Sequence, residues 1–125
     1  MPEHSIGRLA TEVLSQQTQD ESELSWVIAI AQRLNPEADH DQLRNIVLRA
    51  LLELLTNGFV EIRDYSRNRE PQTVIWTGPP EDQVTRIADE WDRLGRDPLF
   101  PSGEVCWVFN TLSGDRKANT GAITN

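Results

Sequence analysis

The spacing of apolar residues changes at one point in the chain, and this change limits the fold class. Over residues 43–55 the apolar positions recur at helical spacing and form a stripe of seven members. Asp39 and Gln42 have the spacing of a capping box at the start of this helix, and Asn57-Gly58 supplies a left-handed stop at its end. Residues 59–65 then alternate apolar and polar side chains and are rich in strand formers. A helix followed directly by a strand predicts an α+β fold.

Two further helices are expected before the helix that carries the stripe at residues 43–55. Residues 6–14 carry one apolar helical stripe, with Ser5 as a candidate N-cap. A second helix is expected to begin at Asp20, because Asp20 and Glu23 have capping-box spacing. Asn35-Pro36 ends it, since proline disfavours helical backbone at the residue before it.

Three elements are expected after the strand at residues 59–65, namely a second strand, a fourth helix and a third strand. Residues 73–77 are a second strand candidate, which would pair with residues 59–65 as a hairpin. Pro80 opens a fourth helix and Gly95 closes it. Residues 105–109 form a continuous apolar strand candidate.

The length of 125 residues is that of one domain. We expect this domain to span residues 1–111. Residues 112–125 are mostly polar and small, and we expect a disordered tail there.

The charge balance indicates the kind of partner. The chain has 20 acidic and 12 basic residues and a net charge of −8, which raises the cost of approaching a nucleic acid and favours a basic protein. It lacks the run of about 18 apolar residues that a transmembrane helix needs. It also lacks a secretory signal pattern, so we expect a cytoplasmic protein that does not engage a membrane.

Candidate catalytic and metal-binding groups are few, and each has a simpler interpretation. Cys106 could act as a nucleophile if it had a neighbouring base, but within an apolar strand a buried, inert thiol is expected. His40 lies between two aspartates, where a solvated helix start is expected in preference to a metal or proton site. The acidic run 89–92 is expected to be a solvated helix face. We therefore expect no enzyme, no cofactor and no metal.

The segment Leu54-Leu55-Thr56-Asn57-Gly58-Phe59-Val60, preceded by three helices and followed by a hairpin, resembles the winged helix-turn-helix family over about residues 6–77. In the members that bind DNA, the third helix enters the major groove and the hairpin, or wing, contacts the backbone. That resemblance implies base contacts by Gln42, Asn45 and Arg49. It implies wing contacts by Arg63, Arg67 and Arg69. Three acidic residues on the third helix depart from this pattern, namely Asp39, Asp41 and Glu53. Many winged-helix domains bind proteins instead.

The first functional hypothesis is a non-enzymatic module that binds a basic protein, in the manner of immunity proteins or antitoxins. Acidic helical residues and one tryptophan would make the contacts: Glu21, Glu23, Asp41, Glu81, Asp89, Glu90, Asp92 and Trp26. The alternative is a DNA-binding regulator that uses the residues of the third helix and the wing. A third hypothesis is a structural homodimer that buries Leu48 and Leu52.

Overall fold

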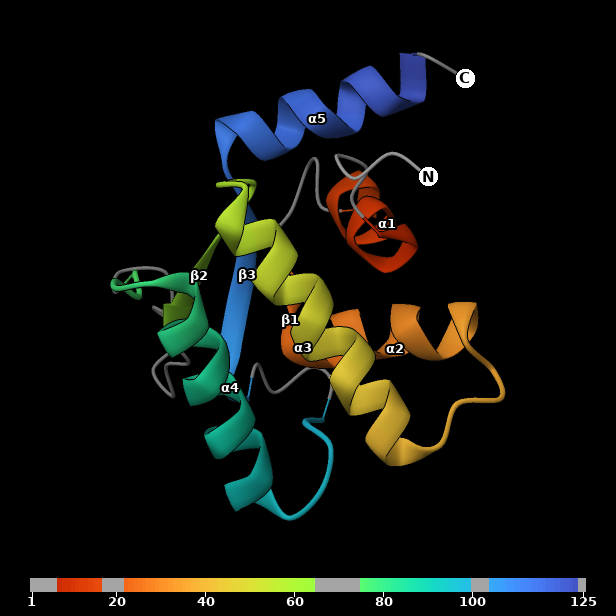
Figure 1. The fold of residues 1–125 in the computed structure, drawn as a ribbon, viewed down its shortest axis with the longest axis vertical. Helices are drawn as coiled ribbons and strands as arrows, with labels where there is room; N and C mark the ends of the chain where they lie inside the picture. The colour runs from red at the N-terminus through yellow and green to blue at the C-terminus, as the bar shows by residue number, and fades with distance from the viewer. Residues whose placement is uncertain (1–6, 17–21, 65–74, 100–103, 124–125) are drawn as a thin grey trace.

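The structure is a computed structural model that describes residues 7–16, 22–64, 75–99 and 104–123. Its elements, in chain order, are α1 (Arg8–Gln16), β1 (Ser22–Glu23), α2 (Leu24–Leu34), α3 (His40–Thr56), β2 (Val60–Asp64), α4 (Pro80–Leu94), β3 (Cys106–Asn110) and α5 (Leu112–Ile123) (Figure 1). The α+β class expected from the sequence is confirmed. In Figure 1 helix α3 lies in front of the sheet, with α4 on one side and α1 and α2 on the other.

The three strands form one antiparallel sheet in the order β1-β3-β2. Val108, in the middle of β3, lies opposite Ser22 on one neighbour and Ile62 on the other. The apolar segment of β3 suits this central position, because Cys106 and Val108 are buried on one face and Trp107 and Phe109 are half-buried on the other. The strand expected at residues 105–109 is therefore confirmed.

The expected hairpin between residues 59–65 and 73–77 is present in part, because Arg63 forms an antiparallel bridge with Ile75 and the Trp76 N–H donates a hydrogen bond of 2.8 Å to the Ile62 carbonyl. Strand β2 also pairs along its whole length with β3, which the sequence did not predict. Residues 65–74, including most of the expected wing, lie outside the described part of the chain. Arg63 pairs both with Trp107 of β3 and with Ile75, so the two pairings use opposite edges of β2. The long apolar strand β3 offers five paired positions and two buried side chains, Cys106 and Val108.

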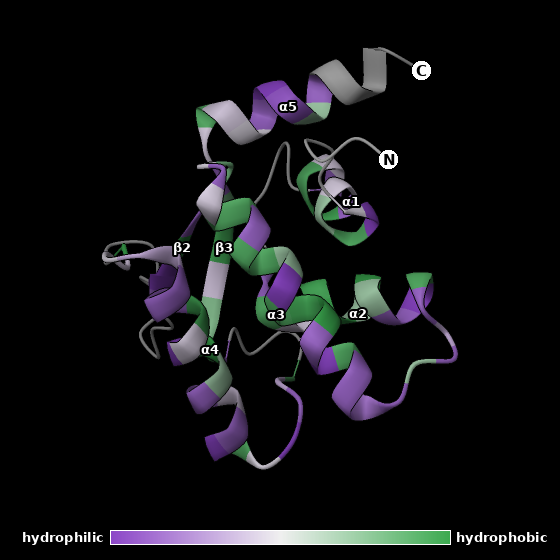
Figure 2. Ribbon diagram, in the orientation of Figure 1, coloured by the Kyte–Doolittle hydropathy of each residue, from purple (hydrophilic) through white to green (hydrophobic). Residues whose placement is uncertain are grey.

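The helical stripes form the core as the periodicity predicts. The fully buried large side chains include Leu14 of α1, Leu24 of α2, Leu51 and Leu54 of α3, and Ile87 of α4. They pack with the inward side chains of the sheet into a single cluster. Figure 2 shows the first turns of α3 as mainly hydrophilic and its later turns as more hydrophobic. The buried side chains of α3 are Leu43, Val47, Ala50, Leu51 and Leu54.

The expected ends of α3 are confirmed. The Asp39 carboxylate accepts a hydrogen bond of 2.8 Å from the Gln42 backbone N–H, and the Gln42 side chain accepts one of 2.9 Å from Asp39 N–H. At the other end Gly58 has a φ of 71°, a conformation that a side chain with a β-carbon disfavours. Both ends of α3 are therefore fixed by local sequence.

Helix α2 begins at Leu24, so the expected start at Asp20 is wrong. Ser22 and Glu23 are extended and pair with β3, and Glu23 is the residue before the helix with φ −89° and ψ 164°. Pairing with the sheet holds these two residues out of the helix, which a local capping pattern cannot predict. Asp20 itself lies outside the described residues.

The expected disordered tail is wrong for residues 112–123, which form α5. The Thr111 side chain accepts a hydrogen bond of 3.1 Å from Gly114 N–H, and the Thr111 N–H donates to the Phe59 carbonyl at 2.9 Å. The Asn110 amide donates at 3.0 Å to the Leu14 carbonyl at the end of α1. These tertiary contacts, and not apolar periodicity, hold α5 against α1 and β3, so the domain extends past residue 111.

Candidate functional site

The exposed face of α3 carries three polar side chains in a row. Gln42, Asn45 and Arg49 are spaced at i, i+3 and i+7, which places them on one side of the helix, and all three are exposed. The buried stripe of α3 faces the other way. The sequence predicted this row correctly.

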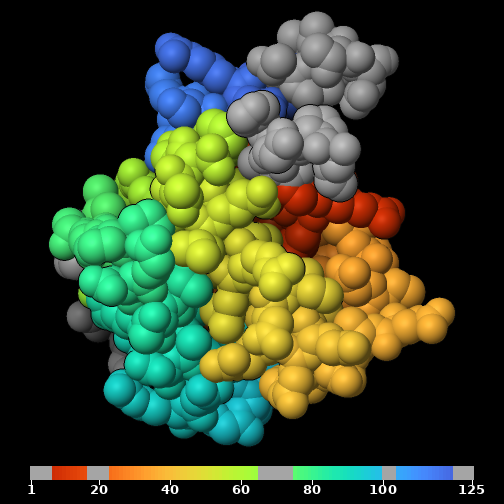
Figure 3. Space-filling model, viewed as in Figure 1, coloured from red at the N-terminus to blue at the C-terminus, as the bar shows by residue number. Residues whose placement is uncertain are grey.

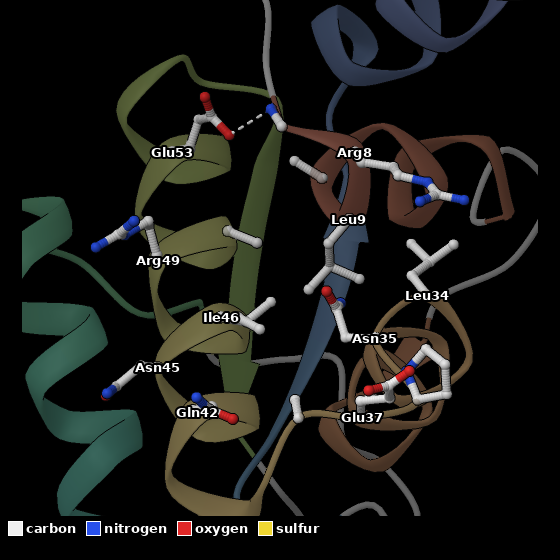
Figure 4. Close-up of a pocket in the computed structure, with 15 residues that line it drawn as sticks. Arg8, Leu9, Leu34, Asn35, Glu37, Gln42, Asn45, Ile46, Arg49 and Glu53 are labelled. Carbon is white, nitrogen blue, oxygen red and sulfur yellow. Dashed lines mark hydrogen bonds between the residues drawn. The ribbon is translucent and has the colours of Figure 1, made fainter.

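A groove runs beside this row, between α3, the start of α1 and the turn that joins α2 to α3 (Figure 4). It has a volume of about 810 Å³. Its floor is apolar and includes Leu9, Ala10, Leu34, Ile46 and Ala50. Its rim is polar and charged and includes Arg8, Glu37, Gln42, Asn45, Arg49 and Glu53. We call this surface the α1–α3 groove.

Helix α4 covers the opposite flank of α3. The Arg44 guanidinium lies 3.0 Å from the Asp92 carboxylate and stacks over the Trp91 ring at 6.0 Å from its centre. One helical turn earlier, His40 Nε2 lies 2.8 Å from Asp97 Oδ1, just beyond the end of α4. Trp91 is itself buried. These contacts fix α4 alongside α3, as Figure 3 shows in space-filling form.

A second set of contacts fixes the middle of α4 to the end of β2. The Arg86 guanidinium lies over the Trp76 ring, 3.7 Å from its centre, and 2.9 Å from the Asp64 carboxylate. The Trp76 indole donates a hydrogen bond of 2.6 Å to the same carboxylate. Arg86 also pairs with Glu90 at 2.8 Å. Trp76 is therefore a packing residue, and it is not an exposed anchor for a partner.

Most of the acidic residues expected to bind a partner lie on α4 or at the start of α3. Helix α4 carries five acidic residues against two basic ones. Glu81, Asp89 and Asp41 are exposed, whereas Glu90 and Asp92 are held in ion pairs with Arg86 and Arg44. We refer to Glu81, Asp82, Asp89, Glu90 and Asp92 as the acidic face of α4.

Three of the expected partner contacts do not join this face. Glu23 is only 3% exposed and accepts a hydrogen bond of 2.8 Å from Ser25 Oγ, so the expectation for Glu23 is wrong. Its position beside β3 explains the burial, because the residue belongs to the sheet. Trp26 is exposed but lies on α2, which packs on α1 and α3. Glu21 lies outside the described residues.

The expected wing contacts are Arg63, Arg67 and Arg69. Arg67 and Arg69 lie outside the described part of the chain. Arg63 lies in β2, where its guanidinium pairs with Glu61 and lies 4.2 Å from the centre of the Phe109 ring. With 24% of its side chain exposed, Arg63 is a packed strand residue and lacks the free side chain of a wing tip.

Leu48 and Leu52, the expected homodimer contacts, lie on the flank of α3 that α4 covers. They follow Arg44 at i+4 and i+8 and so share its side of the helix. Leu48 is partly buried against the core. Much of this surface is therefore used within the chain.

The candidate nucleophile Cys106 lies inside the sheet. Cys106 is fully buried in β3, and burial raises the pKa of its thiol, which opposes formation of a nucleophilic thiolate. Among the described residues no three His, Cys, Asp or Glu side chains come together as a metal site. None of the helices in this part of the chain is both long and apolar enough to cross a bilayer.

Comparison with protein-family models, with curated proteins and with solved structures found no match to this chain.

Sequence reasoning missed the groove and the contacts of α4 with α3. The groove is formed by the start of α1 together with the α2–α3 turn and α3, which lie much later in the chain, and no local pattern indicates that they meet. The pairing of Arg44 with Asp92 is equally long-range. A partial signal existed, because Arg44 interrupts the side of α3 that also carries Leu48 and Leu52.

Proposed function

We propose that this protein is a non-enzymatic binding module that recognises a basic protein through the acidic face of α4. The observation that carries the proposal is the placement of α4 beside α3, which sets acidic side chains along the flank of the polar row. Glu81, Asp82 and Asp89 form no ion pair with the described part of the chain, so they are available to an incoming cation.

The order of elements supports a winged-helix-like origin for this surface. In the winged-helix pattern the hairpin that follows the third helix is the wing. Here β1 and β2 both pair with β3, and α4 lies in the connection between β2 and β3. An acidic helix would then occupy the place of a basic wing.

The charge around α3 favours protein over DNA as the partner. Asp41 and Asp39 lie at the start of α3, and Glu37 precedes them. The acidic face of α4 lies along one flank. Phosphates approaching the polar row would meet these carboxylates, and each unfavourable pair subtracts from the attraction that basic residues provide. DNA binding through Gln42, Asn45 and Arg49 remains the second candidate, because these side chains are exposed in the required row.

The test is affinity capture at low salt from the source cells, with and without nuclease. Three forms are compared: wild type, Asp82→Asn/Asp89→Asn, and Ser113→Lys/Asn119→Lys. Both double variants change the net charge by the same amount, but Ser113 and Asn119 are exposed positions on α5, away from α4. Circular dichroism and thermal melts establish that all three are folded.

Retention of one basic protein after nuclease treatment, lost in the α4 variant and kept in the α5 variant, is the expected result. If both variants lost the basic protein equally, binding would depend only on net charge, and this result would contradict a role for α4. Retention of nucleic acid that disappears with nuclease and with Arg49→Ala would favour the second candidate.

A further inference from the structure

The dipeptide Asn57-Gly58 joins the end of α3 to β2, and both of its residues are exposed. It is the one place in the sequence where asparagine precedes glycine. Asparagine amides are among the thermolabile groups of proteins, and a following glycine favours their loss, because it has no β-carbon to hinder attack by its own backbone nitrogen. Besides ending the helix, this dipeptide therefore carries two groups that can react with each other.

The reaction at such a pair is an intramolecular substitution followed by hydrolysis. The Gly58 nitrogen attacks the side-chain carbonyl carbon of Asn57, gives up its proton to solvent base, and expels the side-chain nitrogen as ammonia. The new carbon–nitrogen bond closes a five-membered succinimide. One water molecule then opens this ring at either carbonyl, which leaves an aspartate or an isoaspartate and one added negative charge.

The native contacts of Asn57 oppose ring closure. Its backbone is helical, with φ −87° and ψ −2°, whereas the succinimide ring fixes ψ far from the helical value. Its side-chain amide donates a hydrogen bond of 2.8 Å to the Glu53 carbonyl, and the Gly58 N–H donates one of 3.0 Å to the Leu55 carbonyl. Both reacting groups are thus directed at carbonyls of α3, so the attack requires this turn to open first.

The start of α5 holds the turn closed, and Figure 1 shows it beside the end of α3. The Thr111 hydroxyl donates a hydrogen bond of 2.6 Å to the Gly58 carbonyl, and the Thr111 N–H donates one of 2.9 Å to the Phe59 carbonyl. Gly114 packs so closely on Phe59 that a β-carbon would overlap its carbonyl oxygen. The two residues after Asn57 are therefore fixed by α5, and the turn cannot open fully while these contacts persist.

We infer that Asn57 is a deamidation site and that the contact of α5 with Gly58 and Phe59 controls its rate. The reaction proceeds from the open turn, so its rate in the native protein is the rate in the unfolded chain multiplied by the fraction of open turns. This inference does not depend on the acidic face of α4.

The products of this reaction favour further opening of the turn. The carboxylate at position 57 cannot donate a hydrogen bond to the Glu53 carbonyl, and it lies at the negative end of the α3 dipole. Isoaspartate also lengthens the backbone by one carbon, which displaces the Gly58 carbonyl from Thr111. Deamidation thus weakens the attachment of α5 to the rest of the fold.

The rate is measured by mass spectrometry on the full chain, incubated at mildly alkaline pH and then digested. Trypsin releases residues 50–63 as one peptide, because Arg49 and Arg63 flank it and no other cleavage site lies between them. Native and denatured wild type are compared. Deamidation in the native protein should be at least about tenfold slower than in denaturant.

Three variants separate opening of the turn from unfolding of the whole chain. Thr111→Val should speed deamidation by about three- to tenfold, because it removes the hydrogen bond to Gly58. Gly114→Ala should act in the same direction by pushing α5 away from Phe59. Ile87→Val lowers stability from the buried side of α4, far from this turn in the sequence, and should deamidate at the wild-type rate. Circular dichroism establishes that each variant is folded at the incubation temperature.

Three results would each overturn the inference. One is an intact Asn57 after long incubation of the denatured chain, which would mean that the site is not reactive. A second is an equal rate in native and denatured protein. The third is a rate that rises as much in Ile87→Val as in Thr111→Val, which would assign the reaction to global unfolding.

The consequence for α5 has its own measurement. Hydrogen exchange of the α5 amides should be faster in Asn57→Asp than in wild type. Asn45→Asp is the matched control, because it makes the same charge change at an exposed position of α3 away from the turn, and it should exchange like wild type. Unchanged exchange in Asn57→Asp would contradict the link between deamidation and α5.

Discussion

His40 and Asp97 join the start of α3 to the segment that follows α4. His40 Nε2 lies 2.8 Å from Asp97 Oδ1, and the same oxygen accepts a hydrogen bond of 3.0 Å from the Trp91 indole. One carboxylate oxygen therefore links an exposed imidazole to a buried tryptophan. With the Arg44–Asp92 pair, this contact sets the position of α4 beside α3.

This contact makes the stability of the α3–α4 pair depend on pH. The hydrogen bond to Asp97, and then the charge of that carboxylate, raise the pKa of His40 above its ordinary value of 6.5. The folded state thus binds the proton more tightly than the unfolded state, and the stabilisation is complete below about pH 6.5 and lost as pH rises through the higher folded-state value. Because His40 is 60% exposed, we expect at most about 0.5 kcal/mol.

An NMR titration of the His40 ring measures this pKa, with His40→Gln used to assign the signal. In Asp97→Asn the pKa should fall toward 6.5. An unchanged pKa in that variant would show that Asp97 is not its cause.

Gly114→Ala should destabilise the protein, although alanine usually stabilises a helix. A β-carbon at this position would overlap the carbonyl oxygen of Phe59 and lie 3.2 Å from Leu14 Cδ2. Relief requires α5 to move away from the corner between α3 and β2, at a cost of about 1–3 kcal/mol. Urea denaturation measures the loss. Ser113→Ala, at the exposed neighbouring position, is the control and should change stability little. A Gly114→Ala protein as stable as wild type would contradict this packing of α5.

Glu104 should contribute stability that is lost only in strong acid. Its two carboxylate oxygens each lie 2.8 Å from the Arg96 guanidinium, and it accepts a hydrogen bond of 2.9 Å from Leu99 N–H. The bonds from Arg96, and then the bond from Leu99, lower its pKa from 4.5 to about 2. The contribution is therefore present above about pH 4.5 and disappears as pH falls through about 2.

Denaturation at a series of acidic pH values tests this contribution. In this acidic range the free energy of unfolding should fall more steeply with pH for wild type than for Glu104→Gln. The reason is that the amide of the variant, unlike the Glu104 carboxylate, does not take up a proton. Parallel curves for the two proteins would be inconsistent with the contact.

Cys106 should not react with thiol reagents in the native protein. It is fully buried, and burial raises the pKa of its thiol, so both access and thiolate are lacking. A colourimetric thiol assay should give no signal in buffer and one equivalent in denaturant. Rapid native labelling would mean that β3 opens readily to solvent.

Local sequence predicted those parts of the fold that local interactions determine. The capping box at Asp39, the left-handed Gly58 and the apolar stripe of α3 need only their near neighbours, and all are present. The same holds for the exposed row of Gln42, Asn45 and Arg49, which follows from helical spacing alone.

The errors concern segments whose structure is set by distant contacts. Ser22 and Glu23 are extended because β3 pairs with them, although Asp20 and Glu23 have the spacing of a capping box. Helix α5 has little apolar periodicity, and its position depends on the close approach of Gly114 to Phe59. The pairing of β2 with β3 was missed because the nearer segment 73–77 had the same strand pattern. In the first two cases a favourable contact across the fold outweighs local preference.

The central place of β3 has a consequence for biosynthesis. Both partners of β3, namely β1 and β2, precede it in the chain, with α4 between β2 and β3. A ribosome therefore releases helices α1 to α4 and both outer strands before the strand that joins them exists. Until then the edges of β1 and β2 are unpaired, and they are open to association with other nascent chains. We expect the polypeptide to depend on chaperones during this interval, and chains that terminate before Cys106 to aggregate instead of forming a smaller folded unit.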